Sequence, residues 1–163
     1  MWRRKPDSLI AAAAAKPAEV RERALGLLAR REHSLQELTR KLLERGLPEE
    51  LVGETVAQLA AEGLLSNARY ADVLTRTRRQ RGHGPRRIQA ELRQRGLGAD
   101  EITPAMEAEA TDWVTQARAA REKRFGPLLP SSHKERIRQT RFLAGRGFTT
   151  EQIRQALGEV EDS

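Results

Sequence analysis

The apolar positions of the chain recur at helical spacing. Leu38, Leu42 and Leu43 lie about one helical turn apart, and Ile88 and Leu92 repeat this spacing further along. Residues three and four positions apart share one face of an α-helix, so the pattern predicts helices that each carry a narrow apolar stripe. No alternating apolar and polar stretch, the pattern of a half-buried strand, persists in the sequence. The prediction is an all-α protein with helices over residues 17–31, 35–45, 48–62, 67–81, 85–95, 100–110, 112–125, 132–145 and 149–160.

An internal repeat groups these predicted helices in threes. The second helix of each group ends at an Arg-Gly pair, and the pairs, which lie 50 and 51 residues apart, are Arg45-Gly46, Arg95-Gly96 and Arg146-Gly147. A period of this length is typical of stacked supersecondary units, each too small to bury its own apolar face. The repeat predicts an elongated tandem array of three three-helix modules. Their predicted bounds are 19–65, 66–110 and 111–160, after a basic tail over 1–18 that is flexible or partly helical.

The predicted helix ends carry residues that favour caps. Each Gly of the Arg-Gly pairs fits the position after a helix C-terminus, where left-handed backbone lets the chain turn. Pro48 and Pro85 are predicted at first helical positions. Pro104 falls near the fourth position of its helix, which predicts a shorter helix with Thr103 as its cap. Three pairs have the spacing of a capping box, namely Ser34 with Glu37, Ser132 with Glu135, and Thr149 with Gln152.

Composition limits the fold and the cellular compartment. Of the 163 residues, 33% are charged, few are aromatic and none is Cys. This favours thin helical layers, excludes disulfides and thiolate metal sites, and fits a reducing cytosol. The run Leu9–Ala15 after the basic start is too short and too weakly apolar for an export signal, and no stretch approaches the ~20 apolar residues of a membrane span. We therefore expect a cytoplasmic protein.

The excess positive charge is uneven along the chain. The net charge is +7, which favours contact with polyanions or acidic protein surfaces. Residues 19–65 hold seven basic and nine acidic side chains, whereas residues 66–110 hold nine basic and six acidic ones. The basic excess therefore belongs to the start, the middle and the end of the chain.

The densest basic segment runs from Val73 to Ala90, with six arginines and no acid. Arg86 and Arg87 are predicted near a helix N-terminus, where free backbone N–H groups also favour anions. We expect this segment to bind an anion or an acidic partner, and the alternative is a solvated face that aids solubility. The residues predicted to make the contact are Arg76, Arg78, Arg79, Arg81, Arg86, Arg87 and Arg93.

Other polar groups give weaker signals. A second basic set has acids among it, and comprises Arg118, Arg121, Lys123, Arg124, Lys134, Arg136, Arg138 and Arg141. The aromatic residues of the last module are predicted to be core rather than platforms for stacked bases. His33, His83 and His133 are predicted to lie in loops exposed to solvent rather than to bind a metal. No motif indicates catalysis, and no cofactor or small-molecule substrate is expected.

Along residues 19–160 the chain resembles the RecX family of recombination regulators. Three landmarks carry the resemblance, and it is their order and separation that make it specific. They are Glu62-Gly63-Leu64-Leu65-Ser66-Asn67 before Arg69-Tyr70-Ala71, then Gly82-His83-Gly84-Pro85 before Arg95-Gly96-Leu97, and then Lys123-Arg124-Phe125-Gly126 before Arg141-Phe142-Leu143 and Arg146-Gly147-Phe148.

The resemblance implies a right-handed array of three three-helix modules that lodges in the groove of a RecA–DNA filament. It implies inhibition of filament extension, of the recombinase's ATPase, of strand exchange and of its coprotease activity, without catalysis by the inhibitor. Binding to naked DNA is expected to be weak. Two alternatives stay open: a basic helical module that acts directly on DNA, and a helical scaffold for an unrelated protein partner.

Overall fold

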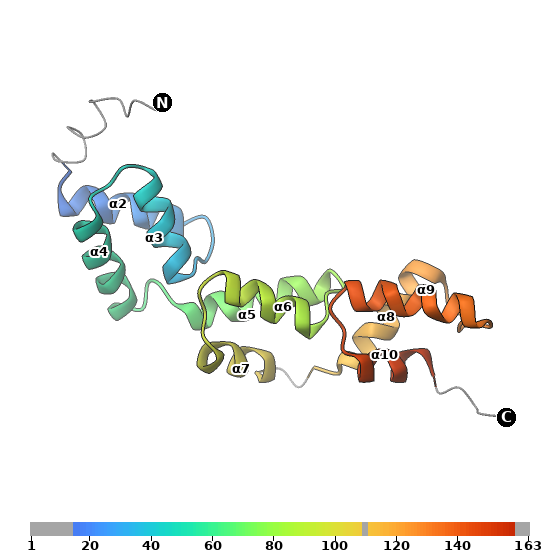
Figure 1. Ribbon diagram of the computed structural model, residues 1–163. Helices are drawn as coiled ribbons and strands as arrows, with labels where there is room; N and C mark the ends of the chain where they lie inside the picture. The colour runs from blue at the N-terminus through green and yellow to red at the C-terminus, as the bar shows by residue number, and fades with distance from the viewer. Residues whose placement is uncertain (1–14, 109–110, 159–163) are drawn as a thin grey trace, which may run out of the picture. The chain divides into compact units, whose positions relative to one another are not determined.

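The computed structural model describes residues 15–108 and 111–158, and within these ranges all regular structure is α-helical. The helices, labelled as in Figure 1, are α2 (Pro17–Leu28), α3 (Leu35–Glu44), α4 (Glu49–Ala61), α5 (Asn67–Gln80), α6 (Pro85–Gln94), α7 (Ala99–Glu107), α8 (Trp113–Phe125), α9 (His133–Gly145) and α10 (Thr150–Leu157). The predicted all-α class is confirmed. The predicted tail falls largely on residues 1–14, which lie outside the described ranges, and the predicted module bounds stay a prediction.

The helix bounds agree with the sequence prediction to within one to three residues, with one clear error. Helix α7 continues through Pro104, so the expected cap at Thr103 is wrong. Instead Gly98 precedes the helix, and the side chain of Glu101 accepts a hydrogen bond from its N–H. Burial of Ile102 and Ala105 on the two sides of the proline offsets the missing backbone hydrogen bond. Pro85 begins α6 as predicted, whereas Pro48 lies one residue before α4.

The caps follow the sequence only in part. Thr149 and Gln152 form the full reciprocal capping box. Ser34 and Ser132 each accept a hydrogen bond from the backbone N–H three residues on, at 3.1 Å. The glutamates of these two pairs do not reach back, because Glu37 and Glu135 form ion pairs with arginines instead.

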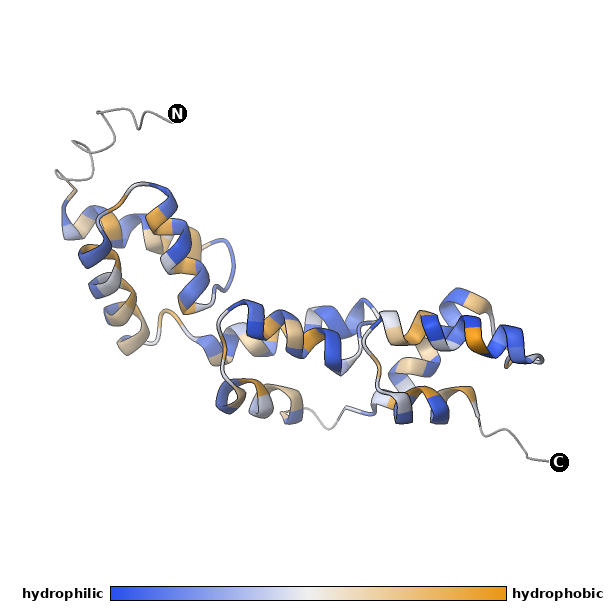
Figure 2. Cartoon of the chain, in the orientation of Figure 1, coloured by the Kyte–Doolittle hydropathy of each residue, from blue (hydrophilic) through white to orange (hydrophobic). Residues whose placement is uncertain are grey.

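The chain forms two compact units. Unit 1 holds the residues up to Tyr70 together with Arg95–Leu97, and unit 2 holds Ala71–Gln94 and the residues from Gly98 onward. In unit 1, helices α2, α3 and α4 pack on one another around leucine and valine side chains. In unit 2, helices α8, α9 and α10 enclose a small core that includes Leu143 and the almost fully buried Phe148. Figure 2 shows apolar and polar residues interleaved along the helices, as a one-sided apolar stripe requires.

An Arg-Gly turn receives the N-terminal end of another helix in each unit. In unit 1 the hydroxyl of Ser34 donates to the carbonyl of Arg95 at 2.8 Å. In unit 2 the N–H of Gly84 donates to the carbonyl of Arg146 at 2.7 Å, and that of Arg86 donates to the carbonyl of Gly147 at 2.9 Å. The Arg-Gly turns at Gly96 and Gly147 therefore each dock a second helix as well as ending one.

Candidate functional site

The predicted arginine segment, Val73–Ala90, covers the second half of α5, a turn and the first half of α6, and Arg93 lies beyond it in α6. Of the seven arginines predicted to make contact, five are exposed and two are half-buried. The exposed ones are Arg76, Arg81, Arg86, Arg87 and Arg93, and the half-buried ones are Arg78 and Arg79.

Arg78 has a structural partner just beyond the acid-free segment. Its Nε and Nη2 atoms donate to the two carboxylate oxygens of Glu91, at 2.8 and 2.6 Å. Both side chains are only about one-fifth exposed, so this bidentate pair ties α5 to α6. Glu91, one residue past the segment, neutralises Arg78. Arg78 therefore contributes less than the exposed arginines to the positive charge of the surface.

His83 lies among arginines in the turn between these helices. Burial, followed by the charges of Arg87, Arg146 and Arg78, lowers the pKa of its imidazole below the ordinary value of 6.5. Its Nδ1 atom is buried and has no hydrogen-bond partner. The ring is therefore neutral near pH 7.

The other two histidines differ from each other. His133 is exposed, as predicted, but His33 is only 1% exposed, so its predicted position in solvent is wrong. Its Nδ1 is 3.0 Å from the carbonyl of Arg31, and its Nε2 is 3.0 Å from the amino group of Lys41. Burial is the main cause of its lowered pKa. Among the described residues, no group of three or more metal-binding side chains is present.

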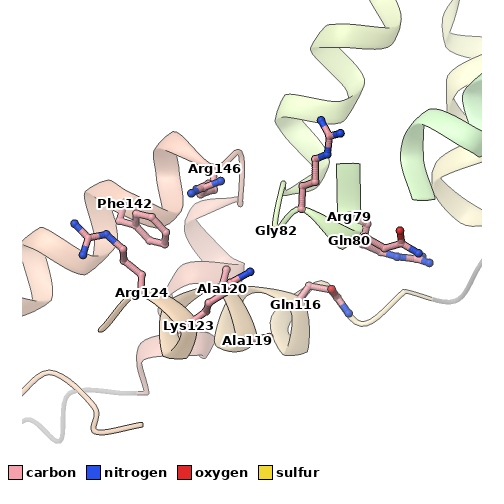
Figure 3. A pocket seen from close by; sticks show the side chains of 11 residues that line it. Arg79, Gln80, Gly82, Gln116, Ala119, Ala120, Lys123, Arg124, Phe142 and Arg146 are labelled. Carbon is pink, nitrogen blue, oxygen red and sulfur yellow. The ribbon is translucent and has the colours of Figure 1, made fainter. Parts of the chain in front are cut away.

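Unit 2 contains a basic pocket of about 320 Å³. Figure 3 shows that its lining residues come from the end of α5, from α8 and from the end of α9. Five cationic side chains line it, and no carboxylate does; the cations are Arg79, Arg81, Lys123, Arg124 and Arg146. We call this cavity the basic pocket.

One face of helix α8 forms a wall of the basic pocket. Gln116, Ala119, Ala120 and Lys123 follow the spacing that places residues on one helix face. The small alanines leave room in front of the wall. A Cβ atom built on Gly82 would lie 3.7 Å from that of Ala120, so the turn after α5 approaches α8 closely.

Two of the basic side chains are held in place. The Nη1 atom of Arg79 donates to the hydroxyl of Thr111 at 2.7 Å. The guanidinium of Arg146 lies 5.1 Å from the ring centroid of Phe142, in cation–π contact. Among the described residues, no carboxylate forms an ion pair with Arg81, Lys123, Arg124 or Arg146, so these four side chains bring uncompensated positive charge to the basic pocket.

The second basic set divides into structural and exposed members. Arg121 is buried, 1% exposed, and its guanidinium donates to the carbonyls of Pro127 and Leu128. Arg118 and Arg136 likewise donate to backbone carbonyls, near the end of α10. Of the aromatic residues predicted to be core, Phe148 is buried in the core, and Trp113 and Phe142 are partly buried and pack against it.

The structure brings two of the seven predicted arginines into the basic pocket, Arg79 and Arg81. Arg76 and Arg79 line a smaller cavity of about 230 Å³. Arg86, Arg87 and Arg93 line neither cavity. The sequence did not predict that Arg146 lies in a site, and it gave only a weak prediction for Lys123 and Arg124. The helical spacing of Gln116, Ala119, Ala120 and Lys123 could have indicated that these residues share one helix face.

Comparison with known proteins shows which family the chain is similar to. Models of the first, second and third three-helix domains of RecX match residues 21–59, 66–106 and 111–157. A regulatory protein RecX of Halorhodospira halophila is 47% identical over 143 residues, which is 88% of this chain and 89% of that protein. The chain belongs to the RecX family. Its helices therefore form three RecX three-helix domains in tandem, as the repeat predicted.

Other family members are similar over most of their length. The regulatory protein RecX of Ectopseudomonas mendocina is 45% identical over 137 residues, 84% of this chain and 91% of the relative. The crystal structure of RecX from Lactobacillus salivarius has the same fold, with a TM-score of 0.75 at 21% identity, over 86% of this chain and 94% of that one. These relatives are named regulatory proteins. In the described part of this chain, no helix is both long enough and apolar enough to cross a bilayer.

Proposed function

We propose that this protein is a non-enzymatic, cytoplasmic regulator that binds the RecA recombinase on its DNA. The bound regulator inhibits filament extension, ATPase activity, strand exchange and coprotease activity. The observation that carries the proposal is membership of the RecX family over all three domains, with relatives named regulatory proteins.

The charge of unit 2 supports a polyanionic or acidic partner. Exposed arginines along α6 and the basic pocket offer many separate cations. Each contact is weak at an exposed surface, but several acting together on a filament that repeats its binding surface give appreciable affinity. Inhibition then results from occlusion of the filament rather than from chemistry.

The exposed arginines of α6 give a direct test. Arg86→Glu with Arg93→Glu reverses two charges that have no ion pair among the described residues, and leaves the Arg78–Glu91 pair intact. We expect the double variant to need a several-fold higher concentration for half-maximal inhibition of recombinase ATPase. The helix should persist, because Glu at position 86 is favourable in the first turn of α6 and offsets the unfavourable Glu at position 93 in its last turn.

The matched control reverses two exposed charges elsewhere, Arg23→Glu with Lys134→Glu, and should inhibit like the unchanged protein. Equal inhibition by both double variants would remove the α6 arginines from the interface. If the unchanged protein does not affect the ATPase at all, the proposed function fails.

Direct action on DNA is the second candidate, favoured by the basic pocket. A protein dedicated to naked DNA binds it tightly and loses affinity steeply as salt rises. A titration of naked DNA at several salt concentrations distinguishes this candidate from a regulator that requires the recombinase.

A further inference from the structure

The basic pocket differs from the other places where this chain buries or crowds its arginines. Arg78 pairs with Glu91, and the Nη atoms of the buried Arg121 donate to backbone carbonyls. Four cations of the basic pocket, Arg81, Lys123, Arg124 and Arg146, repel one another, and no carboxylate lines the cavity to offset this. An external anion in this space would relieve the repulsion.

We propose that the basic pocket binds a phosphodiester group of a nucleic-acid strand. This inference rests on the proposed function to the extent that DNA is the strand at hand. The planar forks of arginine match the geometry of phosphate oxygens, and Lys123 adds a compact charge. The side-chain amides of Gln80 and Gln116 supply neutral donors for phosphate or sugar oxygens.

The size and walls of the basic pocket fit one sugar-phosphate unit. Its volume of about 320 Å³ lies at the low end for ligand sites, too small for a folded protein segment. Ala119, Ala120 and the ring of Phe142 provide an apolar surface for the sugar. The guanidinium of Arg146 lies against that ring.

The other exposed arginines of unit 2 could contact further phosphates of the same nucleic-acid strand. The exposed Arg86, Arg87 and Arg93 of α6 belong to the same unit as the basic pocket, and offer further cations to a strand that leaves it. Arg79 and Arg146 are held by Thr111 and Phe142, so binding costs less side-chain entropy.

The test is an NMR titration of the full chain, at low salt, with a short thymidine oligonucleotide. We expect the largest shifts at the amides of Gly82, Gln116 and Lys123. A glutamate peptide of equal charge serves as the second probe and should bind several-fold more weakly. Shifts concentrated elsewhere, no shifts at saturating oligonucleotide, or equal binding of the peptide would overturn the assignment.

Variants give the second arm. Arg81→Gln and Lys123→Gln should each weaken oligonucleotide binding several-fold and flatten the dependence of log affinity on log salt by about 0.7 for each phosphate that is no longer neutralised. Lys134→Gln removes the same charge from an exposed site of unit 2 and should retain the affinity of the unchanged chain. Pocket variants that bind like this control would contradict the proposal.

The recombinase is absent from these titrations, so the two proposals can fail separately. Weaker oligonucleotide binding in the pocket variants upholds the phosphate site even if the unchanged protein does not inhibit the recombinase. Full inhibition with no pocket-dependent oligonucleotide binding upholds the proposed function and removes the phosphate site.

Discussion

At the scale of single residues, the chain neutralises most of the charge that it buries. Glu37 is 3% exposed and forms ion pairs with Arg31 at 2.7 Å and Arg95 at 3.3 Å. The neighbouring His33 is kept neutral by burial, and its Nδ1–H donates to the carbonyl of Arg31. A buried ionised group without a partner is costly, so these pairings decide which protonation states the fold tolerates.

The lowered pKa of His33 predicts a pH dependence of stability. The unfolded chain takes up a proton near pH 6.5 while the folded chain resists it, so the unfolded state binds more protons. The free energy of unfolding should therefore fall as pH drops from about 7.5 to about 5.5. His83 has a pKa shifted in the same direction and adds to the effect.

Urea denaturation across this pH range checks the prediction. His33→Gln should flatten the decline, whereas His133→Gln, at an exposed position, should leave it unchanged. A protein that gains stability on acidification through this range would contradict the assignment of a neutral, buried imidazole.

At the scale of helices and turns, the glycine of the Arg-Gly pair has two physical roles in unit 2. Gly147 has a φ of +95°, which side chains rarely adopt. A Cβ atom built on it would also lie 2.6 Å from the backbone nitrogen of Arg87 in α6. The turn and the docked helix therefore both require a residue without a side chain.

Gly147→Ala should consequently destabilise the protein more than Gly82→Ala. Gly82 has a φ of +82°, but its added Cβ would meet only Ala120 at an ordinary 3.7 Å. We expect a destabilisation of about 1 kcal/mol for Gly82→Ala from the backbone conformation, and about 1–3 kcal/mol more for Gly147→Ala from the overlap. Equal destabilisation in urea denaturation would show that the docking of α6 on the turn contributes nothing.

The sequence predicted most of the helices but few of the tertiary contacts between them. Apolar spacing and the Arg-Gly repeat predicted the helices and their grouping, because both depend on local pattern. Pro104 misled the prediction, since the burial of its neighbours outweighs the missing hydrogen bond. The position of Arg146 beside Arg81 could not be predicted, because tertiary packing alone brings residues 65 positions apart to one cavity. The burial of His33 and Arg121 has the same origin.

At the scale of the whole molecule, the distribution of charge favours an acidic or polyanionic partner. Acidic side chains outnumber basic ones over residues 19–65, and basic side chains are in excess from residue 66 onward. The main contacts with a polyanion are therefore expected from the second and third RecX domains. The fold by itself does not select a partner, since helical arrays serve many.

The most direct test of the proposed function compares two forms of the same single-stranded DNA, naked and coated with recombinase, at physiological salt. Fluorescence anisotropy of the labelled protein measures its affinity for each. The proposed function predicts much tighter binding to the coated DNA than to the naked strand. Equal affinity for both forms, or tighter binding to naked DNA, would contradict it.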